Sequence, residues 1–178
     1  GPTPEALTIR LPYQPPYDWD GVLDYLSGRL IPGVEIITGG RYARTISLGD
    51  QTGTVVVEPG AGHTLRATIR FSRLAALPQI IARLRRTFDL GANPELINAH
   101  LAEDPFLAPR VASRPGLRVP GTWDHFELAV RAILGQQVSV AQATRQSGII
   151  VAAFGTPLDD PATLDLGLSH RFPTPAQL

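Results

Sequence analysis

The sequence contains no lysine, no cysteine and no methionine, and all 16 of its basic residues are arginine. Without lysine, the chain has no amine side chain for Schiff-base chemistry. Without cysteine, it can form no disulfide, thiol nucleophile, iron–sulfur cluster or cysteine-ligated zinc site. The absence of cysteine also fits a cytoplasmic protein.

Long apolar runs are absent as well. No stretch approaches the roughly 18–20 apolar residues of a membrane span, and none has the form of a secretory signal, so we expect no membrane partner. The 16 acidic residues balance the arginines to a formal charge of zero. This argues against the strongly basic surface of a protein that packages nucleic acid non-specifically. An apolar content of 43% and 178 residues predict a globular chain of one or two domains. We expect no metal, because the four histidines (His63, His100, His125 and His170) lack metal-ligand spacing. We also expect no cofactor.

The first half of the chain alternates in the manner of strands. A strand is predicted near 7–13, followed by four runs at 34–38, 42–49, 53–59 and 63–71 with glycine-rich links between them. Short links favour antiparallel neighbours. In the last run Leu65, Ala67 and Ile69 face one way, and Arg66 and Arg70 face the other. The pattern predicts an α+β fold with an antiparallel sheet and helices on one face.

Helices are predicted at 19–31, with Asp18 as N-cap, at 72–90, and from Asn93 to about Glu103. The segment 104–121 holds four prolines and two glycines, and we place a domain boundary there. The expected domains are 1–104 and 105–178. The second begins with helices at 122–135 and 139–154, and its tail 155–178 shows no strong periodicity.

The stretch FELAVRAILGQQVSVAQATR, residues 126–145, is an amphipathic helix interrupted at GQQVS. We expect Thr122 to cap the first helix and Glu127 to pair with Arg131 on its exposed side. Gly135 should end this helix, and Ser139 should cap the next. The expected buried stripe comprises Phe126, Ala129, Val130, Ile133 and Leu134.

Such a corner has the properties of a DNA probe. Glycine allows close backbone approach, Gln136 and Gln137 carry donors and acceptors, and the following helix offers free N–H groups to an anion. The corner could therefore enter a DNA groove and fill the gap left by a displaced base. The alternative is a plain helix–helix turn with two solvated glutamines.

Several stretches resemble one family. LPYQPPYDWDGVLDYLSGR, RYARTISLG, FDLGANPELIN, RPGLRVPGTWDHFELAVRAILGQQVSVAQA and FPTP are similar, in this order, to the AlkA family of inducible 3-methyladenine DNA glycosylases II, within the helix-hairpin-helix superfamily. The resemblance runs from about residue 10 to 178. It implies a TATA-binding-protein-like sheet domain followed by the first helices of an all-α domain.

The resemblance also implies roles for individual residues. Gln137 matches the position that wedges into the duplex, and Gln136 and Tyr25 match positions near the base pocket. Together with the start of the next helix, this assigns Gln136, Gln137 and Ser139 to DNA binding. Tyr25 would offer an aromatic wall to an electron-poor methylated base.

By resemblance, the chain is part of a DNA repair enzyme that flips alkylated bases out of duplex DNA. The enzyme would hydrolytically excise 3-methyladenine and 7-methylguanine in base excision repair. The family's catalytic aspartate lies downstream of a hairpin motif, so we expect no catalytic residue here and no activity from this chain alone. Asp124, Glu127, Asp159, Asp160 and Asp165 are not assigned its role.

The expected partner is double-stranded DNA with alkylated bases, bound by a monomer in the bacterial cytoplasm, at the nucleoid. A different class remains open, namely a non-catalytic regulatory or protein-docking module that uses the Arg66 and Arg70 face.

Overall fold

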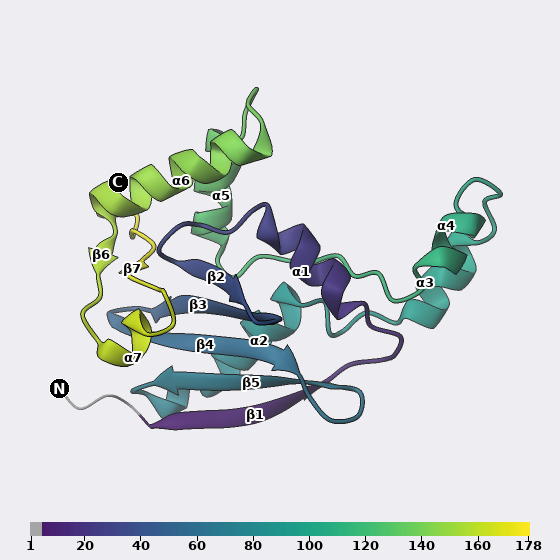
Figure 1. Ribbon diagram of the computed structural model, residues 1–178, viewed down its shortest axis with the longest axis horizontal. Helices are drawn as coiled ribbons and strands as arrows, with labels where there is room; N and C mark the ends of the chain where they lie inside the picture. Colours follow the sequence, from purple (N-terminus) through teal and green to yellow (C-terminus); the bar gives the residue numbers. More distant parts are fainter. Residues whose placement is uncertain (1–4) are drawn as a thin grey trace.

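A computed structural model describes residues 5–178. Its centre is a five-stranded antiparallel sheet in the order β1-β5-β4-β3-β2 (Figure 1). The strands are β1 (Ala6–Pro12), β2 (Glu35–Thr38), β3 (Arg41–Leu48), β4 (Gln51–Pro59) and β5 (Thr64–Phe71). All five predicted strands are confirmed. The β3–β4 turn includes Gly49 at φ +62°, a backbone conformation that glycine adopts without steric cost.

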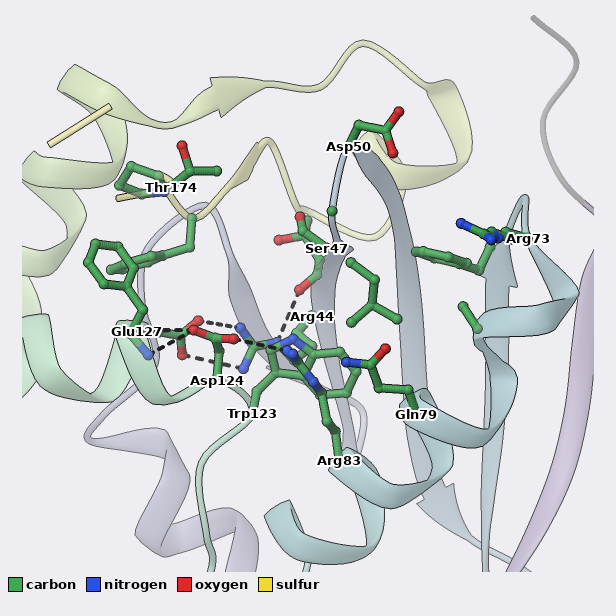
Figure 2. A pocket seen from close by; sticks show the side chains of 18 of the residues that line it. Arg44, Ser47, Asp50, Arg73, Gln79, Arg83, Trp123, Asp124, Glu127 and Thr174 are labelled. Atoms are coloured by element: carbon green, nitrogen blue, oxygen red, sulfur yellow. Dashed lines mark hydrogen bonds and ion pairs between the residues drawn. The ribbon is translucent and has the colours of Figure 1, made fainter. Parts of the chain in front are cut away.

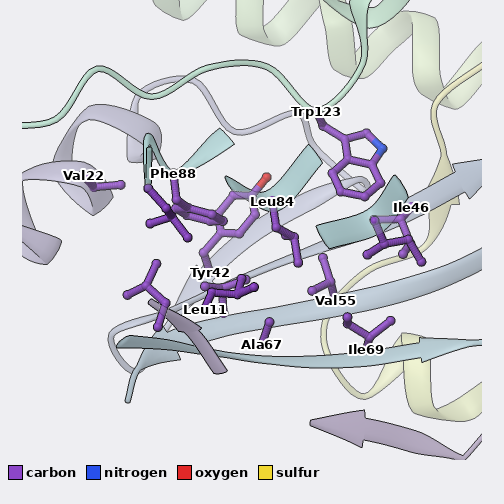
Figure 3. Close-up of a cluster of buried hydrophobic side chains, with 14 of the residues drawn as sticks. Leu11, Val22, Tyr42, Ile46, Val55, Ala67, Ile69, Leu84, Phe88 and Trp123 are labelled. Atoms are coloured by element: carbon purple, nitrogen blue, oxygen red, sulfur yellow. The ribbon is translucent and has the colours of Figure 1, made fainter. Parts of the chain in front are cut away.

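Side-chain alternation on β5 follows the prediction. Leu65, Ala67 and Ile69 are buried, whereas Arg66 is exposed on the other face of the sheet. The buried face is covered by α1 (Trp19–Ser27) and α2 (Leu77–Thr87), which supply core residues to the cluster in Figure 3. The antiparallel sheet with helices on one face is therefore confirmed.

The core is largely aromatic where the two helices meet the sheet. Phe88 is fully buried and contacts Tyr42 edge-on, with ring centroids 5.5 Å apart, and Trp19 at 5.7 Å. The α1 helix begins at Asp18, whose side chain accepts from the Gly21 N–H, as predicted. It ends at Ser27, so the expected extent to residue 31 is wrong.

In the region after the sheet, the expected helix 72–90 is shorter than predicted and one unexpected helix is present. A short 3₁₀ segment, η1 (Leu74–Ala76), precedes α2, and α3 (Pro94–Leu101) begins after its predicted cap Asn93. The proline-rich segment contains a further helix, α4 (Ala108–Ser113). Figure 1 shows α3 and α4 projecting to one side of the molecule.

The last part comprises α5 (His125–Leu134), α6 (Val140–Phe154), β6 (Thr156–Pro157), α7 (Pro161–Leu164) and β7 (His170–Arg171). Asp124 caps α5, accepting from the Phe126 and Glu127 N–H groups, so the expected cap at Thr122 is wrong. The tail folds back onto the sheet, where the Thr45 hydroxyl donates to the His170 carbonyl at 2.8 Å. Within residues 5–178, no helix has the length and apolar character that crossing a membrane requires.

Candidate functional site

The interrupted helix forms the predicted corner. The Gly135 N–H closes α5 on the Arg131 carbonyl at 2.9 Å, and the Gln136 N–H donates to Ile133 at 3.2 Å. The α6 helix starts after Ser139, whose hydroxyl accepts from the Gln142 N–H. The positions of both helix ends at this corner are therefore confirmed.

Both glutamines at the corner are exposed. Gln137 adopts φ +59°, a left-handed conformation that costs a non-glycine residue on the order of 1 kcal/mol or more. Its side chain does not pack into the protein interior, which would have excluded the DNA-probe interpretation; the alternative, a plain turn with two solvated glutamines, also leaves it exposed. Ser139 is also exposed, although its hydroxyl oxygen already serves as the helix cap.

A cavity of about 420 Å³ opens between α1, α5 and α6. Tyr25 from α1 lines it together with Gly135 and Val138 of the corner. The Tyr25 side chain is substantially exposed, at 45%. The structure therefore brings Tyr25 and the corner to one cavity, whereas Gln136 is not among the residues that line it.

One face of the Tyr25 ring already carries a cation. The Arg29 guanidinium lies 4.0 Å from the ring centroid, and its Nη1 donates to the Tyr25 carbonyl at 2.9 Å. This is the geometry of a cation–π contact. A flat cationic ligand would have to use the opposite face of the ring or displace Arg29.

Hydrogen bonds fix the end of α1 against the corner helices. Arg131 from α5 donates to the Arg29 carbonyl at 2.7 Å. Thr144 from α6 donates to the Gly28 carbonyl at 3.3 Å. Because both carbonyls lie just after Ser27, the last residue of the helix that bears Tyr25, both corner helices hold this end of α1.

Glu127 lies where sequence reasoning did not expect it. It is 3% exposed, and its carboxylate accepts from Arg44 Nη2 at 2.6 Å and from Nη1 at 3.4 Å. The expected surface pair of Glu127 with Arg131 is therefore wrong. The reason is tertiary, because β3 places the Arg44 guanidinium directly under the first turns of α5.

Arg44 holds a second carboxylate as well. Its Nη1 lies 3.3 Å from Glu35 Oε1, which also accepts from the Tyr42 hydroxyl at 2.5 Å. Trp123 stacks nearby, with its ring centroid 5.3 Å from the Arg44 guanidinium carbon. We call Glu35, Tyr42, Arg44 and Glu127 the Arg44 cluster.

The electrostatics of the Arg44 cluster follow from its burial. Burial raises the pKa of Glu127, and Arg44 opposes this rise. Burial also lowers the pKa of Arg44, but the charge of Glu127 with that of its other neighbours outweighs this effect and keeps the guanidinium charged. Burial, reinforced by Glu35, raises the pKa of Tyr42, so this phenol stays neutral.

A second cavity of about 690 Å³ lies between β3, α2, α5 and the folded-back tail (Figure 2). Arg44 and Glu127 border both cavities. The sequence offered one signal for this arrangement, namely that Arg44 alternates along the strand with the apolar Tyr42 and Ile46 and so shares their core-facing side.

The buried stripe predicted for α5 is partly wrong. Phe126, Val130 and Leu134 are half-buried, but Ala129 is exposed and Ile133 is 67% exposed, because α5 turns Glu127 to the sheet. Among the other carboxylates, Asp124 caps α5 and pairs with Arg83 at 3.0 Å, and Asp160 caps α7. Across residues 5–178 there is no group of three or more potential metal ligands.

The comparisons with known proteins agree with one another. Residues 8–124 match the family model described as the AlkA N-terminal domain. The chain is 38% identical over 170 residues to DNA-3-methyladenine glycosylase 2 of Escherichia coli K12, covering 94% of this chain and 56% of the relative. It is also 38% identical over 173 residues to a probable bifunctional transcriptional activator/DNA repair enzyme AlkA of Mycobacterium tuberculosis CDC 1551, covering 97% of this chain and 34% of that relative. The chain thus spans about half or less of these relatives.

Solved structures share the fold. A 3-methyladenine DNA glycosylase from Archaeoglobus fulgidus superimposes with a TM-score of 0.80 at 22% identity, over 95% of this chain and 57% of that one. A Clostridium acetobutylicum 8-oxoguanine glycosylase/lyase in complex with double-stranded DNA gives 0.62 at 19% identity, over 91% and 50%.

Proposed function

Because the chain belongs to the AlkA N-terminal domain family, we propose that it is part of a DNA-3-methyladenine glycosylase II. The whole enzyme flips alkylated bases out of duplex DNA and hydrolyses their N-glycosidic bonds during base excision repair. The observation that carries this proposal is the exposed corner at Gln136 and Gln137, beside the cavity lined by Tyr25. An exposed polar corner next to a cavity large enough for a base suits an enzyme that extrudes nucleotides.

The site residues have distinct roles in this proposal. Gln137 enters the minor groove and occupies the space of the extruded base, where its amide hydrogen-bonds the orphaned partner. Gln136 and Tyr25 contact the extruded nucleotide, and the start of α6 at Ser139 faces a phosphate. The left-handed backbone of Gln137 supports this reading, because it holds the side chain outward at an energetic cost that a plain turn would avoid with glycine.

The chemistry requires a carboxylate that stabilises positive charge developing on the sugar while water replaces the base. No carboxylate of this chain is assigned that task. Glu127 bonds to Arg44, and Asp124 bonds to α5 and Arg83. We therefore propose that the chain supplies the wedge and part of the pocket, and that it releases no base by itself.

Base release tests the proposal directly. A full-length version should release 3-methyladenine and 7-methylguanine from methylated duplex DNA, measured by chromatography of the liberated bases. The 178-residue chain should release neither. An inactive full-length protein would defeat the proposed activity, and turnover by the short chain would show that its catalytic group was overlooked.

Binding tests the wedge separately. Gln137→Ala should weaken binding to a duplex with an abasic site more than binding to an intact duplex, measured by fluorescence anisotropy. Gln79→Ala, an exposed glutamine on α2, is the matched control and should change neither. An equal loss on both duplexes would exclude the gap-filling role.

The partner in this proposal is double-stranded DNA with alkylated bases, bound by a monomer in the bacterial cytoplasm, at the nucleoid. Light scattering of the 19.2-kDa chain tests the monomer. We also propose the division into domains 1–104 and 105–178, which predicts that limited proteolysis cuts first within 105–121.

A protein-docking module is the second candidate, and the β1–β5 part of the outer sheet face, which carries three arginines, favours it. Arg10 lies directly opposite Arg66 in the β1–β5 register, and Arg70 follows along β5. Of these three arginines, only Arg66 forms an ion pair with an acidic residue among the described residues, with Glu58 at 2.9 Å. Like charges placed side by side suit an acidic protein segment. Salt-sensitive binding of an acidic peptide that Arg10→Ala abolishes would support this candidate, and unchanged binding would exclude it.

A further inference from the structure

The α5 helix contacts the rest of the protein through a buried charge as well as through the partly buried apolar side chains of Phe126, Val130 and Leu134. Glu127 is its only buried residue, whereas Leu128 and Ile133 are 49% and 67% exposed. The hydrophobic effect has no preferred direction, whereas a charged side chain held by hydrogen bonds does have one. Glu127 is the fully buried residue of α5, so its partner restricts the angle of the helix, together with the Arg131 bond to the Arg29 carbonyl and the Asp124 pair with Arg83.

That partner makes a directional contact. Arg44 presents two nitrogens to the two oxygens of Glu127, at 2.6 and 3.4 Å, across 83 positions of sequence. A planar guanidinium facing a carboxylate fixes both distance and angle. Arg44 is itself held by Glu35 and by the Thr45 carbonyl, to which its Nε donates at 3.0 Å.

Stability alone does not explain this arrangement. A buried ion pair is commonly no better for stability than apolar residues of the same size. The Arg44 cluster is also unbalanced, since one guanidinium faces two carboxylates. What such a pair adds to apolar packing is a directional contact that restricts the register between the two elements that it joins.

The geometry converts this register into the position of the corner. Gln136 lies nine positions after Glu127, so the corner is about 14 Å along the helix from the Arg44 contact. A tilt of about 10° around that contact would move the corner by about 2 Å. Arg131, one turn beyond Glu127, ties α5 to the Arg29 carbonyl at the end of the helix that bears Tyr25.

We propose that Arg44 and Glu127 are positioning residues, which fix the angle of α5 on the sheet and thereby aim the Gln136–Gln137 corner relative to Tyr25. The inference that this aim serves DNA recognition rests on the proposed function. The mechanical part of the proposal, namely that these two residues determine where the corner lies, does not rest on the proposed function.

The mechanical part can be measured in this chain, which has no cysteine to compete for labels. Spin labels at Gln137→Cys and at Thr8→Cys, an exposed site on β1, should report one narrow distance distribution. Glu127→Gln, and separately Arg44→Lys, should broaden or shift it. The control Glu103→Gln removes a carboxylate at an exposed position and should leave the distribution unchanged.

The recognition part uses unlabelled protein and two duplexes. Wild type should prefer the abasic-site duplex over the intact one, and Glu127→Gln should reduce this preference by about 3- to 30-fold while binding to intact duplex is retained. Glu127→Asp, which restores the charge, should recover part of it. All variants are compared at a temperature where circular dichroism shows each of them folded.

The outcomes separate the two ideas. An unchanged distance distribution in both Glu127→Gln and Arg44→Lys would overturn the positioning role, whatever the DNA shows. A wild type without preference for the abasic duplex would defeat the proposed function and leave the distance result standing. If Glu127→Gln does not fold, the distance distribution of Arg44→Lys tests the positioning role, because this variant keeps the positive charge and loses the planar two-nitrogen guanidinium.

Discussion

Replacing Arg44 by methionine should destabilise the protein more than replacing Glu127 by glutamine. Arg44→Met leaves Glu35 and Glu127 buried without a cation, a change that typically costs about 3–5 kcal/mol. Glu127→Gln leaves Arg44 paired with Glu35, and the new amide oxygen still accepts a hydrogen bond. Its cost should be about 1–2 kcal/mol.

Both variants can be compared by urea and thermal unfolding at neutral pH. For a chain of 178 residues, each kcal/mol lowers Tm by about 2–4 °C, so Arg44→Met should lose about 6–20 °C. Arg145→Met, at an exposed site on α6, is the control and should lie within about 0.5 kcal/mol of wild type.

The pH dependence adds a second check with a definite sign. Burial raises the pKa of Glu127, and Arg44 counteracts this rise, so removing Arg44 should raise it further. A carboxyl group whose pKa is higher in the folded state binds protons on folding, so acid stabilises the fold. The deficit of Arg44→Met should therefore shrink as pH falls toward the ordinary glutamate pKa. A deficit smaller than that of Glu127→Gln, or one that is constant with pH, would refute the unbalanced-charge reasoning.

Three further predictions concern single residues outside this pair. The hydrogen bond from Arg114, followed by that from the Gly21 N–H, lowers the pKa of Asp18, so its carboxylate stabilises the fold above its ordinary pKa. This contribution is lost as pH falls through the lowered value, and Asp18→Asn should flatten the acid limb of a stability-against-pH curve; an unchanged limb would contradict the assignment. Arg118 is 5% exposed, donates to the Pro16 carbonyl at 2.8 Å and lies over the Tyr17 ring. Arg118→Met should therefore lower the free energy of unfolding in urea by about 3 kcal/mol. An unchanged free energy of unfolding would show that water replaces these hydrogen bonds. Gln137→Gly should relieve the left-handed backbone and raise stability by up to about 1 kcal/mol while weakening abasic-site binding, whereas a loss of stability would mean that the side chain has a structural contact.

The sequence by itself determined the features that depend on near neighbours. Alternation along β5 fixed which of Leu65 and Arg66 faces the core, since successive side chains of a strand point to opposite faces. Asp18, Asn93 and Ser139 were identifiable as caps because a short polar side chain just before a helix can accept from the free N–H groups of its first turn, a contact between near neighbours in sequence. The corner at Gly135 was predictable from the sequence because glycine commonly ends a helix.

Tertiary structure decided what depends on partners far along the chain. Glu127 had the spacing of a surface pair with Arg131, but it is buried because β3 brings Arg44 beneath α5. Ile133 had the spacing of a core residue, but α5 turns its other side to the sheet, and Ile133 faces solvent. Helical periodicity defines a face without saying what lies against it, so only the packed structure shows whether an apolar side chain or a charged one is enclosed.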